Sequence, residues 1–327
     1  MSARSLACAA GLALLGVAAG VMIGAQPISP FRLVRILTDP GEPMAALFFA
    51  WRLPRVFGAF LVGACLSIAG VLFQGAFRNP LAEPYLLGSA AGGALGATFA
   101  ILAPVPALSA VGLPLLAFLG AWGATLLVLG ICRMARIAEA GGMLLVGIAV
   151  AALLGSIRSM ATLMLSDESV SLRAVLSWTL GGLQTPTGGT LLAFALLTAL
   201  CLLLALRIAR GLDILGFGEE TAATMGLDVG RFLGIALTLG ALATGLTVAW
   251  GGVLGFVGLV VPHLVRWWVG ARHAPLLLHA SLLGGGLVAL LDGLSRSLLP
   301  PSEIPLGLIT ALLGAPFFLL LLIGRAR

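Results

Sequence analysis

The chain has 327 residues, of which 60% are hydrophobic and 9% charged, with a formal net charge of +6 and a mean hydropathy of +1.16. Because roughly a quarter of the residues in a soluble domain are charged, this composition excludes a soluble protein and indicates a polytopic membrane protein. All 18 basic residues are arginine, which excludes a P-loop and lysine Schiff-base chemistry, so whatever energy the protein uses is expected to come from outside this chain.

Apolar runs of helix length follow one another along the chain, without the alternation of residues that barrel strands show. They predict an all-α polytopic fold with about ten transmembrane helices in one domain over residues 1–327. The frequent glycines, 45 in number, predict close helix packing. The first run is interpreted as a span rather than a signal peptide, because it is long and has a poor cleavage site. The expected spans are 5–25, 56–77, 85–103, 107–132, 142–165, 189–208, 231–250, 255–270, 275–298 and 304–324.

The longest predicted outer loop, residues 26–53, lies between the first two spans. Its proline-containing turns predict irregular backbone with a short helix over 44–51. The loop runs into the sequence WRLPR, which carries Arg52 and Arg55. Two cationic side chains at this outer surface are expected to meet an acidic partner or ligand.

A second outer segment, residues 166–188, is predicted to contain a short amphipathic helix that carries Arg173. In the span before it, Arg158 lies at bilayer depth, where a charge is unfavourable by about 2.5–3.5 kcal/mol. Arg158 is therefore expected to face a cavity or a partner. Pairing of its guanidinium with backbone carbonyls is the structural alternative.

The cytoplasmic segment of about 212–230 contains four acidic residues, although the whole chain has twelve. Gly218 precedes Glu219 and Glu220, which suit the positive end of a helix dipole, and Gly226 suits a left-handed helix stop. These features predict a surface helix of about two turns. Its small middle residues suit a groove of another protein, and an ordinary amphipathic loop helix is the alternative.

Arginines are unevenly divided between the two sides of the ten predicted spans, eleven on one side and six on the other. The positive-inside rule places the eleven, and both termini, in the cytoplasm. Arg296 belongs to the outer six, and Asp292 lies four residues before it, where its carboxylate can hold the guanidinium. Scattered solvated arginines are the alternative to a docking surface.

The segment LGFGEETAATMGLDVGR resembles the coupling-helix segment of ABC importer permeases of the ferric-siderophore, haem and vitamin B12 family. The resemblance extends in order and spacing over essentially the whole chain. Four further motifs carry it, namely WRLPRVFGAFLVGACLSIAGVLFQ, RNPLAEPYLLGSAAGGALGA, GFVGLVVPHLVRWWVG and PLGLITALLGAPFF.

The resemblance implies a type II ABC importer permease that forms a homodimer in the bacterial inner membrane. Two cytoplasmic ATPases, which bind ATP and Mg, and a periplasmic substrate-binding protein are its implied partners, and no cofactor is expected on this chain. The implied docking residues for the binding protein are Arg52, Arg55 and Arg296. The implied ATPase contacts are Gly218, Glu219, Glu220, Thr221, Ala222, Ala223, Met225 and Gly226.

The expected cargo is a large iron-bearing chelate, and we favour haem because Arg158 and Arg173 suit its two carboxylates. Ferric siderophore and cobalamin are alternatives. An ion-coupled secondary transporter is disfavoured, because acidic residues fall at span ends rather than at the bilayer midplane. An intramembrane enzyme would need paired catalytic groups at one depth, and no catalytic or metal-ligating residue is predicted. Nucleic acid is not expected as a partner.

Overall fold

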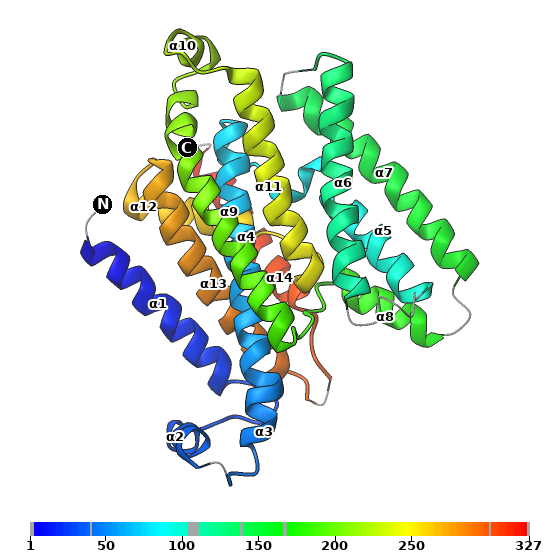
Figure 1. Ribbon diagram of the computed structural model, residues 1–327, viewed down its shortest axis with the longest axis vertical. Helices are drawn as coiled ribbons and strands as arrows, with labels where there is room; N and C mark the ends of the chain where they lie inside the picture. The colour runs from blue at the N-terminus through cyan, green and yellow to red at the C-terminus, as the bar shows by residue number, and fades with distance from the viewer. Residues whose placement is uncertain are drawn as a thin grey trace.

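The computed structural model describes residues 3–39, 41–103, 111–137, 140–165, 169–300 and 302–325, and over these residues it is all-helical (Figure 1). Seven of the described helices are long and apolar enough to cross a membrane. They are α1 (Ala3–Met22), α4 (Leu53–Ala76) with the helical turns before it, α6 (Gly112–Met134), α7 (Ala140–Leu165), α9 (Gly188–Leu215), α11 (Val229–Gly251) and α13 (His273–Ser297). Two shorter apolar helices are α5 (Ser89–Leu102) and α12 (Val257–Val269), and α14 (Leu306–Arg325) contains a shorter apolar stretch, Leu306–Leu321. Each of the predicted spans corresponds to one of these helices, so the predicted fold class is confirmed.

α4 lies at the centre of the bundle, and α13, α11, α9 and α12 pack around it (Figure 1). Most α4 residues are buried, as expected for a helix that is apolar on every side. α5 and α6 form a closely packed pair that contacts α11, and α7 packs against α5. The helices that flank the predicted coupling segment, α9 and α11, thus both rest on α4.

Glycines let the central helices approach until their backbones touch. A Cβ added at Gly63 of α4 would overlap the carbonyl oxygen of Gly284 on α13. Gly92 of α5 and Gly120 of α6 face each other in the same way. This confirms the close packing that the glycine content predicts, and such contacts favour association of helices in lipid.

The predicted outer loop over residues 26–53 contains more helix than expected. It forms α2 (Pro30–Thr38), α3 (Ala45–Leu47) and the π-helical turn η1 (Phe48–Arg52), which leads directly into α4. The wide π turn comes just before Pro54, which has no N–H to donate to a preceding carbonyl. Arg52 and Arg55 therefore lie on a continuous helix rather than in a loop.

The break between α11 and α12 is held by side chains from the segment that precedes α5. In that segment, a short 3₁₀ helix η2 spans Pro84–Leu87. Glu83 accepts the backbone N–H of Phe256 at 2.9 Å, and the Tyr85 hydroxyl accepts that of Leu254 at 3.2 Å. Phe256 itself has a positive φ of 69°. These bonds satisfy backbone groups that the two helices leave unpaired.

α9 continues to Leu215, beyond the predicted end at residue 208, because no proline or glycine pair interrupts it. After α9, the six-residue α10 (Glu219–Thr224) lies beyond the spans and is shorter than the two turns predicted. α10 is seen end-on at one extremity of the molecule in Figure 1, and α2 lies at the opposite extremity. We call these the α10 end and the α2 end. The start of α1 and the end of α14 both point toward the α10 end, as an even number of spans requires (Figure 1).

Candidate functional site

The residues predicted to contact an ATPase lie together at the tip of the α10 end, and we call Gly218–Gly226 the coupling segment. Both end glycines have positive φ, 104° at Gly218 and 88° at Gly226, so the predicted stop at Gly226 is confirmed. Ala222 is fully buried where α10 packs on α9 and α11. The opposite face of the segment is exposed, and it is formed by Glu220, Thr221, Ala223, Thr224 and Met225.

The coupling segment is tied to the end of the central helix through one ion pair. Glu219 accepts a hydrogen bond from Arg78, which follows α4, at 2.6 Å. Both side chains are roughly half exposed, so the pair contributes little to stability. The pair links the start of α10 to the residues that follow α4.

At the α2 end, three guanidinium groups converge around one buried carboxylate. Asp292 on α13 is fully buried and accepts hydrogen bonds from Arg55 and Arg296, each at 3.0 Å. Arg55 also binds Glu303 through two bonds of 3.0 and 2.7 Å. Together with Arg52, these residues form what we call the outer arginine cluster. The predicted pairing of Asp292 with Arg296 is confirmed.

Members of the cluster differ in how much of the guanidinium is available to a partner. Arg296 is only 7% exposed and donates to the carbonyl of Gly20 at 2.8 Å. Arg52 is partly exposed and donates to the carbonyl of Gln26 at 2.7 Å through Nη2, while its Nη1 is buried and has no hydrogen-bond partner among the described residues. Because Arg52 is more exposed than Arg296, it is better placed to contact a partner, and Arg296 has a supporting position. A docking role for either residue stays a prediction.

The two arginines predicted to line the pathway lie on α7 and on α8 (Ser169–Thr179), which is the short amphipathic helix expected in residues 166–188. Arg158 is partly buried and donates to the hydroxyl of Thr179 at 3.3 Å, and no backbone carbonyl of the described residues accepts from it. Arg173 is exposed, about 9 Å before Thr179 along the α8 axis. The buried side chains Val175 and Trp178 fasten α8 to the bundle.

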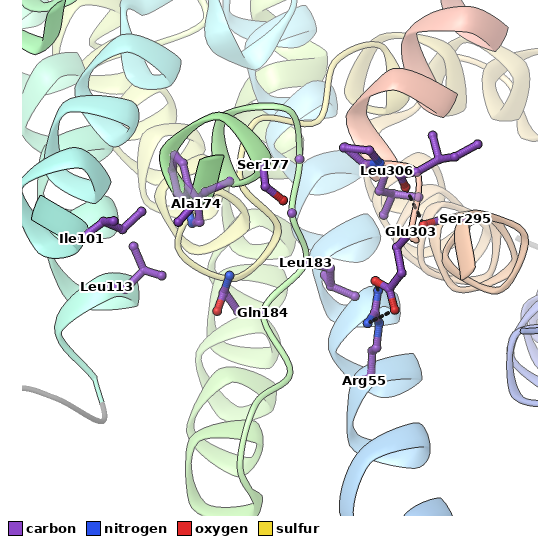
Figure 2. A pocket seen from close by; sticks show the side chains of 15 residues that line it. Arg55, Ile101, Leu113, Ala174, Ser177, Leu183, Gln184, Ser295, Glu303 and Leu306 are labelled. Atoms are coloured by element: carbon purple, nitrogen blue, oxygen red, sulfur yellow. Dashed lines mark hydrogen bonds and ion pairs between the residues drawn. The ribbon is translucent and has the colours of Figure 1, made fainter. Parts of the chain in front are cut away.

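A groove opens beside α8 toward the outer arginine cluster, as Figure 2 shows. Ile101 and Leu113 form one wall, and the Arg55–Glu303 pair lies on the other side. Gln184 lies between them, with its amide directed into the space (Figure 2). This groove joins apolar walls to hydrogen-bonding groups at the mouth of the predicted pathway.

Several contacts at these sites were not predicted from the sequence. Glu303 pairs with a residue 248 positions away, and its flanking prolines were the only hint that its backbone is fixed near a helix start. Asp213 on α9 contacts His273 at the start of α13, 60 positions away. Partners so distant in the chain leave no spacing pattern that a single sequence can reveal.

Comparison with known proteins identifies the family. A profile of the FecCD transport family matches residues 12–324. The hemin transport system permease protein HmuU of Yersinia pestis is 38% identical over 291 residues, which cover 88% of this chain and 86% of that protein. The vitamin B12 import system permease protein BtuC of Escherichia coli (strain UMN026) is 34% identical over 331 residues, covering 99% and 96%.

Among solved structures, an inward-facing conformation of a metal-chelate type ABC transporter is similar in fold and sequence. It superposes with a TM-score of 0.82 at 30% identity, covering 99% of this chain and 100% of that chain. The chain therefore belongs to the FecCD transport family and is an ABC importer permease for chelates.

Proposed function

We propose that cytoplasmic ATPase subunits dock on the coupling segment and drive this permease in the bacterial inner membrane. The α10 end and both termini then lie in the cytoplasm, and the α2 end faces the periplasm. The observation that carries the proposal is the coupling segment. It is a largely exposed acidic helix beyond the spans, and its one buried residue, Ala222, packs it against the bundle. ATP and Mg belong to the ATPase subunits, and this chain itself binds no cofactor.

The permease is proposed to act as a homodimer, with the outer face of α7 along a central pathway. That face exposes Ser156 and Ser159 beside Arg158, on a helix that is mostly apolar. Polar side chains on a membrane-spanning helix are more stable beside a water-filled cavity or a protein partner than beside lipid. ATP-driven closure of the ATPases would pull the two coupling segments together and open this pathway alternately to each side of the membrane.

A periplasmic binding protein is proposed to dock at the outer arginine cluster through Arg52. Replacing Arg52 with Glu is expected to weaken its binding at least about tenfold and to flatten the salt dependence, because steering by opposite charges is lost. Titration of labelled binding protein onto the permease complex at two salt concentrations measures both effects. Arg32→Glu is the control, since Arg32 is also on the α2 end but is paired with Glu42 at 3.2 Å. Equal weakening by both variants would argue for a diffuse charge effect and against docking at Arg52.

Haem is the proposed cargo, supported by Arg158 and Arg173 near the α2 end and by the hemin permease among the relatives. Ferric siderophore and cobalamin are second candidates, and a vitamin B12 permease is also among the relatives. Uptake of each cargo into liposomes that contain the full complex separates them, because haem brings a Soret band inside. Import of cobalamin without haem would overturn the choice of cargo and leave the importer function intact.

Arg158→Leu is expected to lower uptake of an anionic chelate at least about tenfold, equivalent to about 1.4 kcal/mol, because it removes a cation from the pathway. The complex should still assemble, as judged by co-purification of its subunits. The control is Met164→Leu, an exposed position of the same helix. Normal uptake by the Arg158→Leu protein would show that the guanidinium serves only to hold Thr179.

A further inference from the structure

α13 is held by an acidic side chain near each of its two ends. At the α10 end, Asp213 of α9 accepts the backbone N–H of His273, the first residue of α13, at 2.9 Å. The same carboxylate oxygen lies 2.6 Å from Nδ1 of the His273 ring, which therefore donates to it. At the α2 end, the buried Asp292 ties α13 to Arg55 of α4. One helix thus connects two sites that face opposite sides of the membrane.

The Asp213–His273 contact lies at the point where α9 gives way to the coupling segment. Asp213 occupies the last turn of α9, directly before the residues that lead to Gly218. The His273 ring packs directly on Gly75 in the last turn of α4. A Cβ added at Gly75 would lie 2.6 Å from Nε2 of the ring. Leu212 of α9 would lie 3.2 Å from the same Cβ. The ends of α4 and α9 and the start of α13 are therefore in direct contact, so a displacement of the end of α9 would press on α13.

Two features make α13 able to carry such a displacement. It is a single helix of 25 residues, about 37 Å long, with no proline beyond its first turn. The Asp213 carboxylate also caps its N-terminus, where a negative charge is favourable. At its far end, Arg296 reaches the carbonyl of Gly20 on α1. Movement of α13 along its own axis would consequently change the outer arginine cluster.

We propose that Asp213 and His273 are positioning residues that pass movement of the coupling segment to α13, which carries it to the outer arginine cluster. The proposal rests on the proposed docking of ATPases at the coupling segment. Because coupling between two binding sites is reciprocal, ATP binding in the ATPases changes the affinity for the binding protein, and the binding protein changes the affinity for ATP by the same factor.

The test uses the assembled complex of permease, ATPases and binding protein in lipid nanodiscs. The dissociation constant of labelled binding protein is measured without nucleotide and with a non-hydrolysable ATP analogue, and the ratio of the two values reports the coupling. A ratio of one means that the two sites are not coupled. Asp213→Ala and His273→Ala are each expected to bring the ratio at least about fivefold closer to one. The double variant should reduce it no further, because the two residues act through one contact.

The matched control is Asp228→Ala. Asp228 is an acidic cap on the other side of the coupling segment, where it accepts the N–H of Arg231 at 3.1 Å within the start of α11. This variant should keep the wild-type ratio. Asp213→Asn retains an oxygen that can accept the backbone N–H of His273. This variant is expected to keep part of the coupling, and so to separate the effect of capping from the effect of the interaction with the ring.

The outcomes distinguish the relay from the function on which it rests. A permease with which the ATPase subunits do not co-purify would overturn the proposed function. A wild-type complex that contains them, but whose affinity for the binding protein does not change with nucleotide, would overturn the relay. A normal wild-type ratio that persists in both alanine variants would overturn only the relay. Thermal unfolding is recorded for every variant, and a ratio that falls solely in variants with lowered unfolding temperature would likewise count against the relay.

Discussion

Met225→Asp is expected to abolish stable association with the ATPase subunits while leaving the permease folded. Met225 is 60% exposed at the C-terminal end of α10, so the change removes no buried contact from the permease itself. In a docked complex the new carboxylate would be desolvated beside the negative end of the helix dipole. A single central contact of this kind commonly contributes 2 kcal/mol or more, so the affinity should fall at least about 30-fold. Titration of labelled ATPase onto the permease in nanodiscs measures it.

Met134→Asp provides a control with the same chemistry. Met134 is 80% exposed at the end of α6, which also points toward the α10 end. It lies outside the coupling segment, so its replacement should leave ATPase affinity within about threefold of the unchanged protein. If the two variants weakened binding equally, the ATPase would be contacting a broad surface rather than the coupling segment.

Asp292→Ala is expected to destabilise the permease by about 3 to 5 kcal/mol, because two guanidinium groups lose the buried carboxylate that balances their charge. Asp292 has no exposed surface, and both Arg55 and Arg296 donate to it. Thermal unfolding in one detergent, followed for both proteins, should show a markedly lower transition temperature for the variant. Binding-protein affinity should fall as well, since the outer arginine cluster loses its centre.

Glu303→Gln tests whether burial decides the size of that effect. Glu303 binds Arg55 through two hydrogen bonds, yet its side chain is 49% exposed. Exposed ion pairs typically contribute about 1 kcal/mol or less, so this variant should unfold close to the wild-type temperature. A loss as large as that of Asp292→Ala would mean that the cluster is stabilised mainly from its solvent side.

The spanning helices and the family could be predicted from the sequence, for identifiable reasons. An apolar run of about 20 residues has few options in lipid other than a helix, so each window corresponds to one helix even where the boundaries differ. The resemblance to chelate importers is confirmed by the family match over residues 12–324 and by relatives that align over most of the chain. It decides against the ion-coupled carrier and the intramembrane enzyme.

Helix ends, and contacts between residues far apart in the chain, could not be predicted from the sequence. α9 continues to Leu215 through Arg210, which lies beyond the predicted end at residue 208, because charged side chains are compatible with a helix that leaves the membrane. The burial of Arg296 depends on Gly20 and Asp292 being brought together by packing of α1 against α13. The charge of Arg296 predicts a solvent-exposed side chain, and only the packing of the neighbouring helices shows that it is buried.

The bond from Glu83 to the N–H of Phe256 has a consequence for biogenesis. α12 has 13 residues, too few to cross a bilayer alone, and the backbone before it is non-helical. The groups that satisfy this backbone come from Glu83 and Tyr85, which are synthesised roughly 170 residues earlier. α12 can thus settle in the membrane only against a partly assembled amino-terminal half, so maturation of the protein follows the order of its translation.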